Sequence, residues 1–164
     1  MSGNEYIIET TDLSKSYGPH MALEKLNLKV NKGATGLLGP NGAGKSTFLK
    51  TILGLIQATS GDGTVLGHDI RTEGAAIRSR IGYMPEYDAL NPDMEAIYQV
   101  KYSGELLGMN PVIAMARAHE VLQYVGLGEQ RYRNIGSFST GMKQATKLAC
   151  SIIHDPELII ADEP

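Results

Sequence analysis

Residues 39–47, with the sequence GPNGAGKST, match the pattern G-x-x-x-x-G-K-[ST] at every fixed position. Glycines in such a stretch let the backbone fold tightly, so that its N–H groups point inward at a bound phosphate. The Lys45 ammonium can reach the β- and γ-phosphates of a nucleotide, and the Ser46 hydroxyl can ligate Mg²⁺. The sequence therefore predicts a phosphate-binding loop for a magnesium–nucleotide complex, formed by Gly39, Pro40, Asn41, Gly42, Ala43, Gly44, Lys45, Ser46 and Thr47.

The segments on either side of this loop have the patterns that would position it. ATGLLG, residues 34–39, is apolar enough to form a strand leading into the loop. FLKTILGLI, residues 48–56, then places its apolar residues at helical spacing, so the positive end of a helix would face the same phosphate. These apolar residues are Phe48, Leu49, Ile52, Leu53 and Ile56. A glycine-rich turn before a helix is the plain alternative, but strand, loop and helix together favour phosphate binding.

Short apolar runs elsewhere predict further strands. They are EYIIET at residues 5–10, LNLKV at 26–30, GTVLGHDI at 63–70, RIGYMPE at 80–86 and ELIIA at 157–161. The last of these runs is apolar throughout, so we expect it to be a buried strand.

From about residue 92 the apolar residues recur at helical spacing instead. Asn110 followed by Pro111 is typical of a helix start. The helical set consists of Ile97, Val100 and Leu107, then Ala114, Ala118, Val121, Leu122 and Val125, and, after Gly141, Met142, Ala145, Ala149 and Ile152. This order of elements predicts an α/β core with an all-helical subdomain inserted into it.

Composition limits the class of protein further. The chain has 164 residues, of which 42% are hydrophobic, and this suits one packed domain of ordinary size. Its net charge of −3, without a basic cluster, argues against a nucleic-acid partner. Cys150 is the only cysteine, so no internal disulfide can form. Neither a secretory signal nor an apolar run of the ~18–20 residues that a membrane span needs is present in this sequence.

Three more stretches narrow the function. FSTGMKQ at residues 138–144 resembles the signature motif of ATP-binding cassette (ABC) ATPases. IGYMPE at residues 81–86 resembles the segment that enters the Q-loop of that family, and HDPELIIADEP at residues 154–164 resembles its Walker B strand. Phosphate loop, Q-loop, signature and Walker B follow one another in the order and at the spacing of the family. The chain is thus similar to the nucleotide-binding domain of an ABC transporter, of the exporter type.

The resemblance implies an α/β fold, namely a P-loop NTPase (RecA-like) core with an antiparallel N-terminal β-subdomain and an inserted helical subdomain. Residues 1–164 would form a single incomplete ABC ATPase domain, with about residues 1–90 and 141–164 as catalytic core and about 91–140 as helical signature subdomain. Family members continue after Walker B with a D-loop, further strands and a switch histidine. We therefore expect the chain to be truncated after Walker B, with its C-terminal part missing.

The same resemblance assigns roles around the γ-phosphate. Glu163 corresponds to the catalytic residue that polarises the attacking water. Asp162 corresponds to the residue that holds Mg²⁺ through its water shell, together with Ser46. Thr47 is expected to help hold the α-phosphate. Glu86 stands where the family usually has glutamine; its carboxylate is expected to bind the metal, with a side chain that faces solvent or the membrane partner as the alternative.

Other roles involve the adenine ring and a second subunit. Tyr17 corresponds to the aromatic residue that stacks on adenine, with an ordinary half-buried strand tyrosine as the alternative. Ser139, Thr140 and Gly141 are expected to act in trans, closing the ATP site of a second nucleotide-binding domain in a homo- or heterodimer. Thr140 and Met142 replace the more usual glycine and glutamine of the signature, but the serine and the second glycine remain.

We therefore expect an ATP- and Mg²⁺-dependent ATPase subunit that drives a separate transmembrane permease from the cytoplasmic face of the membrane. The chain by itself is expected to be inactive. Two alternatives remain at this point. One is an ABC ATPase without a transport role, such as a translation or repair factor. The other is a nucleotide-binding fragment without turnover.

Overall fold

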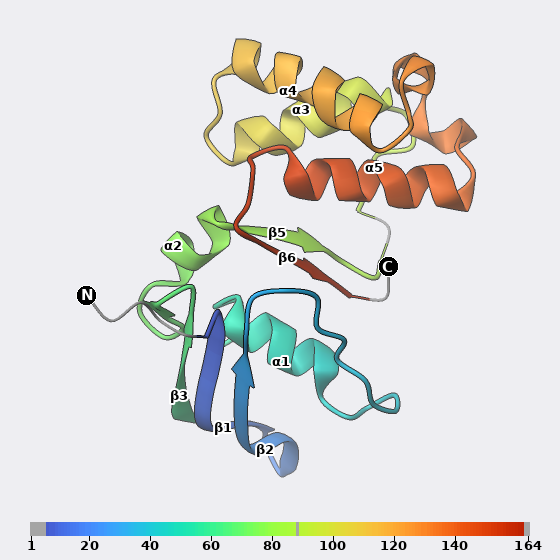
Figure 1. Cartoon of the computed structure of the whole chain (residues 1–164). Coiled ribbons are helices and arrows are strands. Elements are labelled where there is room, and N and C mark those ends of the chain that lie inside the picture. Colours follow the sequence, from blue (N-terminus) through green and yellow to red (C-terminus); the bar gives the residue numbers. More distant parts are fainter. Residues whose placement is uncertain (1–5, 88, 163–164) are drawn as a thin grey trace. The chain divides into compact units, whose positions relative to one another are not determined.

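The computed structural model describes residues 6–87 and 89–162 of the chain. The chain divides into two compact units, Met1–Arg78 and Ser79–Pro164. Figure 1 labels the α-helices and most strands of both units.

The first unit contains an antiparallel sheet of four strands in the order β2-β1-β3-β4. Its strands are β1 (Ile8–Tyr17), β2 (His20–Val30), β3 (Ser60–Val65) and β4 (His68–Asp69). β1 and β2 form a long hairpin in which Ile8 pairs with Val30 and Tyr17 with His20. The turn between them contains Gly18 in the left-handed conformation, which suits glycine because it has no Cβ. The predicted antiparallel N-terminal β-subdomain is confirmed.

β1 and β3 approach each other closely where both strands are irregular. Their register shifts between Thr11 and Ser14, and a Cβ on Gly61 would collide with the carbonyl of Asp12. Gly61 also has a φ of +78°. This position therefore requires glycine for two independent reasons.

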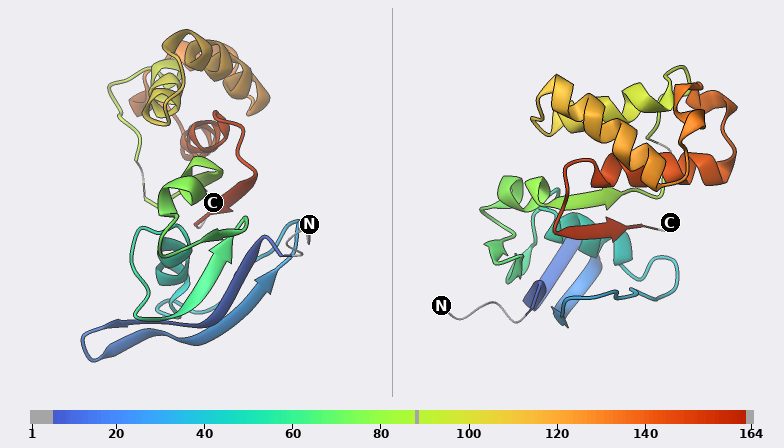
Figure 2. Two further views of the ribbon diagram at one scale, coloured as in Figure 1. Left: turned by 90° about the vertical axis from the view of Figure 1, so that its left-hand side faces the viewer. Right: turned by 45° about the horizontal axis from the view of Figure 1, so that its top comes forward.

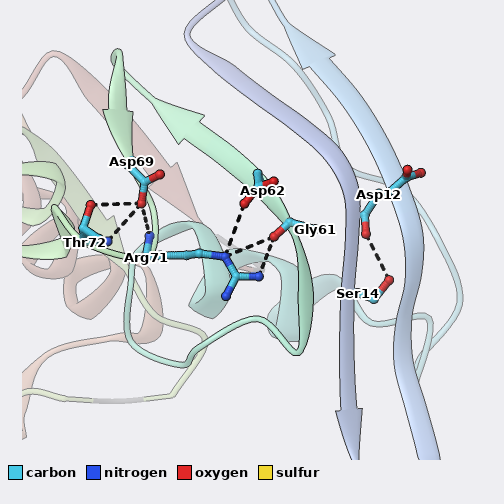
Figure 3. Close-up of polar contacts among 7 residues, drawn as sticks. All are labelled: Asp12, Ser14, Gly61, Asp62, Asp69, Arg71 and Thr72. Carbon is cyan, nitrogen blue, oxygen red and sulfur yellow. Dashed lines mark hydrogen bonds and ion pairs between the residues drawn. The ribbon is translucent and has the colours of Figure 1, made fainter.

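A network of polar contacts holds the segments around β4, as Figure 3 shows. The Arg71 guanidinium donates to the carbonyl of Gly61 through Nε at 3.1 Å and lies 3.5 Å from a carboxylate oxygen of Asp62. The Asp69 carboxylate accepts hydrogen bonds from the backbone N–H groups of Arg71, at 2.7 Å, and Thr72, at 3.0 Å. These bonds lower the pKa of Asp69 because they stabilise its charged form.

Helix α1 (Lys45–Ile52) follows the phosphate loop and contacts β2 and β3. The predicted apolar face is largely confirmed, because Phe48, Ile52 and Leu53 are buried. The helix ends earlier than its apolar pattern, with Leu53 as its C-cap and Gly54 in the left-handed conformation behind it. The buried apolar residues of the unit are Ile8, Leu13, Leu23, Phe48, Ile52, Leu53, Ala58, Val65, Ile70 and Ile77. A short helix, α2 (Gly74–Ser79), follows β4.

One predicted strand is absent. Residues 34–39 do not form a strand among the described residues, although their apolar character favoured one. A strand exists by pairing, and no described strand pairs with this segment. Leu38 is 94% exposed, so no apolar surface of the described residues covers it either. Apolar composition therefore predicted a strand that lacks a partner here.

The second unit combines two parallel strands with helices. β5 (Ile81–Met84) pairs with β6 (Leu158–Ala161) so that Ile81 faces Leu158 and Met84 faces Ala161. The main helices are α3 (Ala96–Leu106), α4 (Pro111–Tyr124) and α5 (Thr140–Ile152). Two short 3₁₀ helices, η1 (Glu129–Tyr132) and η2 (Ile135–Ser137), precede α5. Within this unit α5 lies between the strand pair and helices α3 and α4 (Figures 1 and 2).

The helices enclose one apolar core. The predicted start of α4 is confirmed, because Pro111 is its first residue and the Asn110 side chain caps it by accepting from the N–H of Val112 at 2.9 Å. The buried members of this core are Ala96, Ile97, Val100, Ala118, Val121, Leu122, Leu127, Ile135, Phe138, Ala149 and Ile153. Half of the twelve residues expected from helical spacing are among them, and four more pack against this core while partly buried: Val125, Met142, Ala145 and Ile152.

Two sequence expectations in this unit were wrong. Leu107 lies beyond the end of α3 and is exposed, because the helix stops at Leu106 and the chain turns through Gly108 in the left-handed conformation. The strand β6 is buried on one face only: Ile160 is buried, whereas Ile159 on the other face is exposed. Within the part of the chain that the structure describes, no helix combines the length and apolar character required to span a membrane.

Candidate functional site

The conformation of the phosphate loop is set mainly by its backbone, through glycines at positive φ and one backbone hydrogen bond. Gly42 and Gly44 both adopt positive φ, at +82° and +86°, a conformation that a side chain would strain. A Cβ on Gly44 would also collide with the carbonyl of Ala22 in β2. An N–H···O bond of 3.1 Å from Ala43 to Pro40 closes a turn within the loop. Glycine is therefore required at Gly44 by conformation and by space.

The start of α1 is prepared for an anion. Gly44 is the N-cap and has no side chain to occupy the N–H groups of the first turn. The helix dipole places partial positive charge at the same point. In this structure the Lys45 ammonium donates to loop carbonyls, at 2.8 Å from Gly39 and 3.1 Å from Pro40. The loop is exposed, so phosphate oxygens can replace these carbonyls as acceptors, and the residues present fit a nucleotide phosphate.

Tyr17 lies at the end of β1, where it pairs with His20, and its side chain is 48% exposed. The Lys15 ammonium lies 5.0 Å from the centre of its ring, a distance suited to a cation–π contact. This exposure fits the ordinary half-buried strand tyrosine and equally leaves a ring face open for stacking. Stacking on adenine stays a prediction.

In the second unit, Asp162 follows β6 and is 9% exposed. Its N–H donates to the carbonyl of Met84 at 2.9 Å, which continues the ladder between β5 and β6. Tyr83 pairs with Ile160, two residues before Asp162, so Tyr83 and Asp162 share one face of the strand pair. Burial raises the pKa of Tyr83, and the charge of Asp162 and a hydrogen bond to its carboxylate raise it further.

Glu86 follows β5 and is exposed. Its negative charge also contributes to the raised pKa of Tyr83, as does Tyr87. The negative charges of Asp162 and Glu86 therefore both raise the pKa of the Tyr83 hydroxyl, and the effect of Asp162 is the larger. The predicted catalytic residue Glu163 lies outside the described residues.

The signature residues begin helix α5. Ser139 is its N-cap and accepts from the N–H of Met142 at 3.3 Å. Phe138, just before it, is buried in the helical core. Ser139, Thr140 and Gly141 are exposed, which leaves them accessible to a second molecule.

The predicted metal ligands belong to different units. Ser46 lies in the first unit, and Glu86 and Asp162 lie in the second. Among residues 6–87 and 89–162, no group of three or more His, Cys, Asp or Glu side chains lies close enough to hold a metal ion. The donor set itself, a hydroxyl and two carboxylates, has the oxygen ligands that Mg²⁺ prefers. The metal site thus stays a prediction.

Sequence reasoning missed two residues of the second unit. Tyr83 was part of a recognised motif, and its alternation with Gly82 and Met84 indicated which face it shares with Asp162 only once the register of β5 and β6 was known. Lys147 is buried, and its ammonium donates to the carbonyls of Pro85 and Glu86. No local pattern in the sequence pointed to Lys147.

Comparison with known proteins agrees with this geometry. The family model described as "ABC transporter" matches residues 23–164. The chain is 39% identical over 159 residues to the linearmycin resistance ATP-binding protein LnrL of Bacillus subtilis (strain 168), covering 96% of this chain and 51% of the relative. It is 38% identical over 159 residues to the bacitracin transport ATP-binding protein BcrA of Bacillus licheniformis, with the same coverage of both. The chain thus spans about half the length of these curated relatives.

Solved structures show the same fold. A structure described as the ATP binding subunit of an ABC transporter superposes with a TM-score of 0.80 at 28% identity, covering 95% of this chain and 65% of that one. CbiO1 from Clostridium perfringens, part of the ABC transporter complex cbiONQ, superposes with a TM-score of 0.86 at 23% identity, covering 98% and 66%. The mixed α/β fold predicted from the sequence is confirmed. The chain belongs to the ABC transporter family.

Proposed function

We propose that this protein is the ATP-binding and ATP-hydrolysing subunit of an ABC exporter and that it drives a separate membrane permease. The observation that carries this proposal is the phosphate loop, in which a glycine N-cap leaves the first turn of α1 open to an anion and Lys45 stands beside it. Several relatives support export in particular, because they are named for Nod factor export or for resistance to daunorubicin and doxorubicin.

The first unit binds the nucleotide in this proposal. The N–H groups of the loop and of the first turn of α1 hold the phosphates. Lys45 exchanges the carbonyls of Gly39 and Pro40 for β- and γ-phosphate oxygens. Thr47 adds a hydroxyl near the α-phosphate. Tyr17 offers an exposed ring face for adenine.

The second unit supplies acidic groups for hydrolysis. Asp162, Glu86 and Ser46 would hold Mg²⁺, which would supply positive charge to neutralise the phosphates. The Tyr83 hydroxyl is close enough to the Asp162 carboxylate for that negative charge to raise the pKa of Tyr83. Glu163 accepts the proton of the attacking water as general base.

The exposed signature residues point to a second copy of the domain. Ser139, Thr140 and Gly141 would close the ATP site of a partner subunit, whose own signature would close the site on this chain. A helix N-terminus with an exposed serine is suited to contact a γ-phosphate across such an interface. ATP would then hold the two subunits together until hydrolysis lets them separate.

Coupling to transport requires a membrane partner. We place the protein on the cytoplasmic face of the membrane, attached through a transmembrane permease. A gene for a multi-span membrane protein beside its own gene, and copurification of the two products, would support this partner. An ABC ATPase of translation or repair would lack both.

The experiment that tests hydrolysis is Glu163→Gln in the full-length protein. The substitution keeps the shape of the side chain and removes the base, so we expect the ATPase rate to fall by about 10²-fold or more while ATP still binds. Glu157→Gln is the matched control, because Glu157 is exposed and pairs with Arg80 at 2.6 Å.

Unchanged turnover in Glu163→Gln would contradict the role of Glu163. ATP binding by the unaltered full-length protein without any turnover would instead favour a nucleotide-binding module.

A further inference from the structure

Helix α5 carries a buried lysine at its centre. Lys147 is 6% exposed, and lysine is rarely buried to this degree unless its ammonium is paired. Its Nζ donates to two backbone carbonyls, that of Pro85 at 2.9 Å and that of Glu86 at 3.2 Å. Both carbonyls belong to the segment that directly follows β5. The lysine therefore ties α5 to this segment through the backbone, whatever side chains the segment carries.

The contact belongs to a stripe of three residues that attaches α5 and the turn after it to β5. Lys147 and Ser151 lie four residues apart on one face of α5, and His154 follows in the turn after the helix. His154 Nε2 lies 3.2 Å from the carbonyl of Ile81, and a Cβ on Gly82 would collide with the carbonyl of Ser151. The contacts thus begin at Ile81, the first residue of β5, and extend to Pro85 and Glu86 beyond its last residue.

Lys147 differs from the other two members of the stripe in what it contacts. Ser151 and His154 touch the strand itself, which is also held by β6. Lys147 reaches past the strand, to residues 85 and 86, which pair with no strand among residues 6–87 and 89–162. Removing it would release this segment and leave β5 in place.

The other end of α5 carries the signature residues. Ser139 is its N-cap, and Lys147 lies eight residues further along, about 12 Å at 1.5 Å per residue. A helix of this length moves as a rigid element. A shift of its N-terminus therefore also displaces Lys147, and with it the backbone of Pro85 and Glu86.

We propose that Lys147 is a positioning residue that fixes the backbone of Pro85 and Glu86 to the signature helix, so that Glu86 and Ser139 move as one body. This inference rests on the proposed function, in which Glu86 faces the metal and Ser139 faces the nucleotide of a second subunit. Lys147 itself touches neither nucleotide nor metal. Lys147 links the position of Glu86 to that of Ser139. Binding of ATP to the signature residues would therefore also fix the position of Glu86.

The test compares Lys147→Met with the unaltered protein, both at full length. Methionine keeps the length and the apolar stem but removes both hydrogen bonds, so we expect faster hydrogen–deuterium exchange in a peptide covering residues 85–90. Exchange in β6 should stay the same, since the strand ladder is untouched. The ATPase kcat should fall on the order of tenfold, because small displacements in a catalytic site have effects of this size or larger, whereas the Kd for MgATP should not change.

Two further variants sharpen the result. Lys147→Arg keeps the charge and the donors and should restore most of the ATPase rate. Lys101→Met is the control for loss of a lysine, since the Lys101 ammonium pairs with Glu105 at 2.7 Å within α3. It should leave exchange and kcat at their original values.

Each outcome decides the proposal. Unchanged exchange at residues 85–90 in Lys147→Met would overturn the tether. Faster exchange with unchanged kcat would overturn the coupling and leave Lys147 a packing residue. If Lys147→Met does not fold, Lys147→Gln takes its place, and failure of both to fold would likewise make the residue structural.

The exchange measurement does not depend on ATP. It therefore separates failure of this inference from failure of the proposed ATPase activity.

Discussion

The phosphate loop is held in shape by contacts within the loop, whereas the end of the β5–β6 pair is held by residues distant in the sequence. The loop is exposed and is shaped by its own backbone, with glycines at positive φ and a lysine that folds back onto loop carbonyls. At the strand end, by contrast, side chains and carbonyls are held by partners far away in the sequence. Asp162 contacts Tyr83, and Lys147 contacts Glu86. A backbone-built site is encoded locally, whereas a site built from tertiary contacts depends on the register of strands and helices.

The largest effect should come from a methyl group added to the loop. In Gly44→Ala, the new Cβ meets the carbonyl of Ala22 and the residue must also hold φ at +86°, so we expect loss of ATP binding and a loss of about 2 kcal/mol or more in the free energy of unfolding. Gly42→Ala is the matched control, because its φ is +82° but its Cβ would face open space. It should cost only about 1 kcal/mol.

Urea unfolding and ATP titration of both variants measure this difference. Equal effects of the two substitutions would show that the collision with β2 is unimportant and that backbone strain alone shapes the loop.

A smaller effect is expected at the strand end, from Tyr83→Phe. This change removes the hydroxyl whose pKa is raised by the nearby Asp162 carboxylate, and it keeps the ring in place. Because partners of a metal ligand orient it, the Mg²⁺ concentration for half-maximal ATPase should rise roughly tenfold, with little change in the Kd for ATP. Tyr98→Phe, on the exposed side of α3, is the control. A Mg²⁺ titration with superimposable curves for all three proteins would contradict a role for Tyr83 in orienting Asp162.

The smallest effect concerns His154 at the end of α5. Burial lowers its pKa, although the Ile81 carbonyl and Asp155 oppose the shift, and Nδ1 has no hydrogen-bond partner among the described residues. Below the ordinary value of about 6.5, the unfolded chain therefore binds the proton more readily than the folded one. The free energy of unfolding should fall as pH drops from about 6.5 through the lowered pKa.

His154→Gln removes this titration, so its free energy of unfolding should fall less between pH 7 and 5.5 than that of the unaltered protein. Urea unfolding across this range measures the slopes. The carboxylates of Asp69 and Glu73 also have lowered pKa values, but their stabilising contribution is lost only at more acidic pH. Parallel slopes for the two proteins would contradict the role given to His154.

The same contrast explains what the sequence could predict. The helix after the loop and the helix start at Asn110 and Pro111 depend on residues that are neighbours in the chain, and both predictions are confirmed. The strand at residues 34–39 was predicted wrongly because strands need partners, and partners are not visible in a local pattern. The contacts of Tyr83 and Lys147 were missed for a related reason: each depends on residues about 60 or more positions away, brought close only by the register of β5, β6 and α5.

The central claim is that residues 39–47 bind the phosphates of ATP, and calorimetric titration of Lys45→Ala with MgATP tests it most directly. Lys45 bonds only to carbonyls of an exposed loop in this structure, so its removal should leave folding intact. A charge-assisted hydrogen bond contributes about 1.5–3 kcal/mol, so the account predicts affinity at least about tenfold weaker than that of the unaltered protein. Lys50→Ala, in the last turn of the same helix, should bind ATP normally. Equal affinity in Lys45→Ala and the unaltered protein would contradict the account.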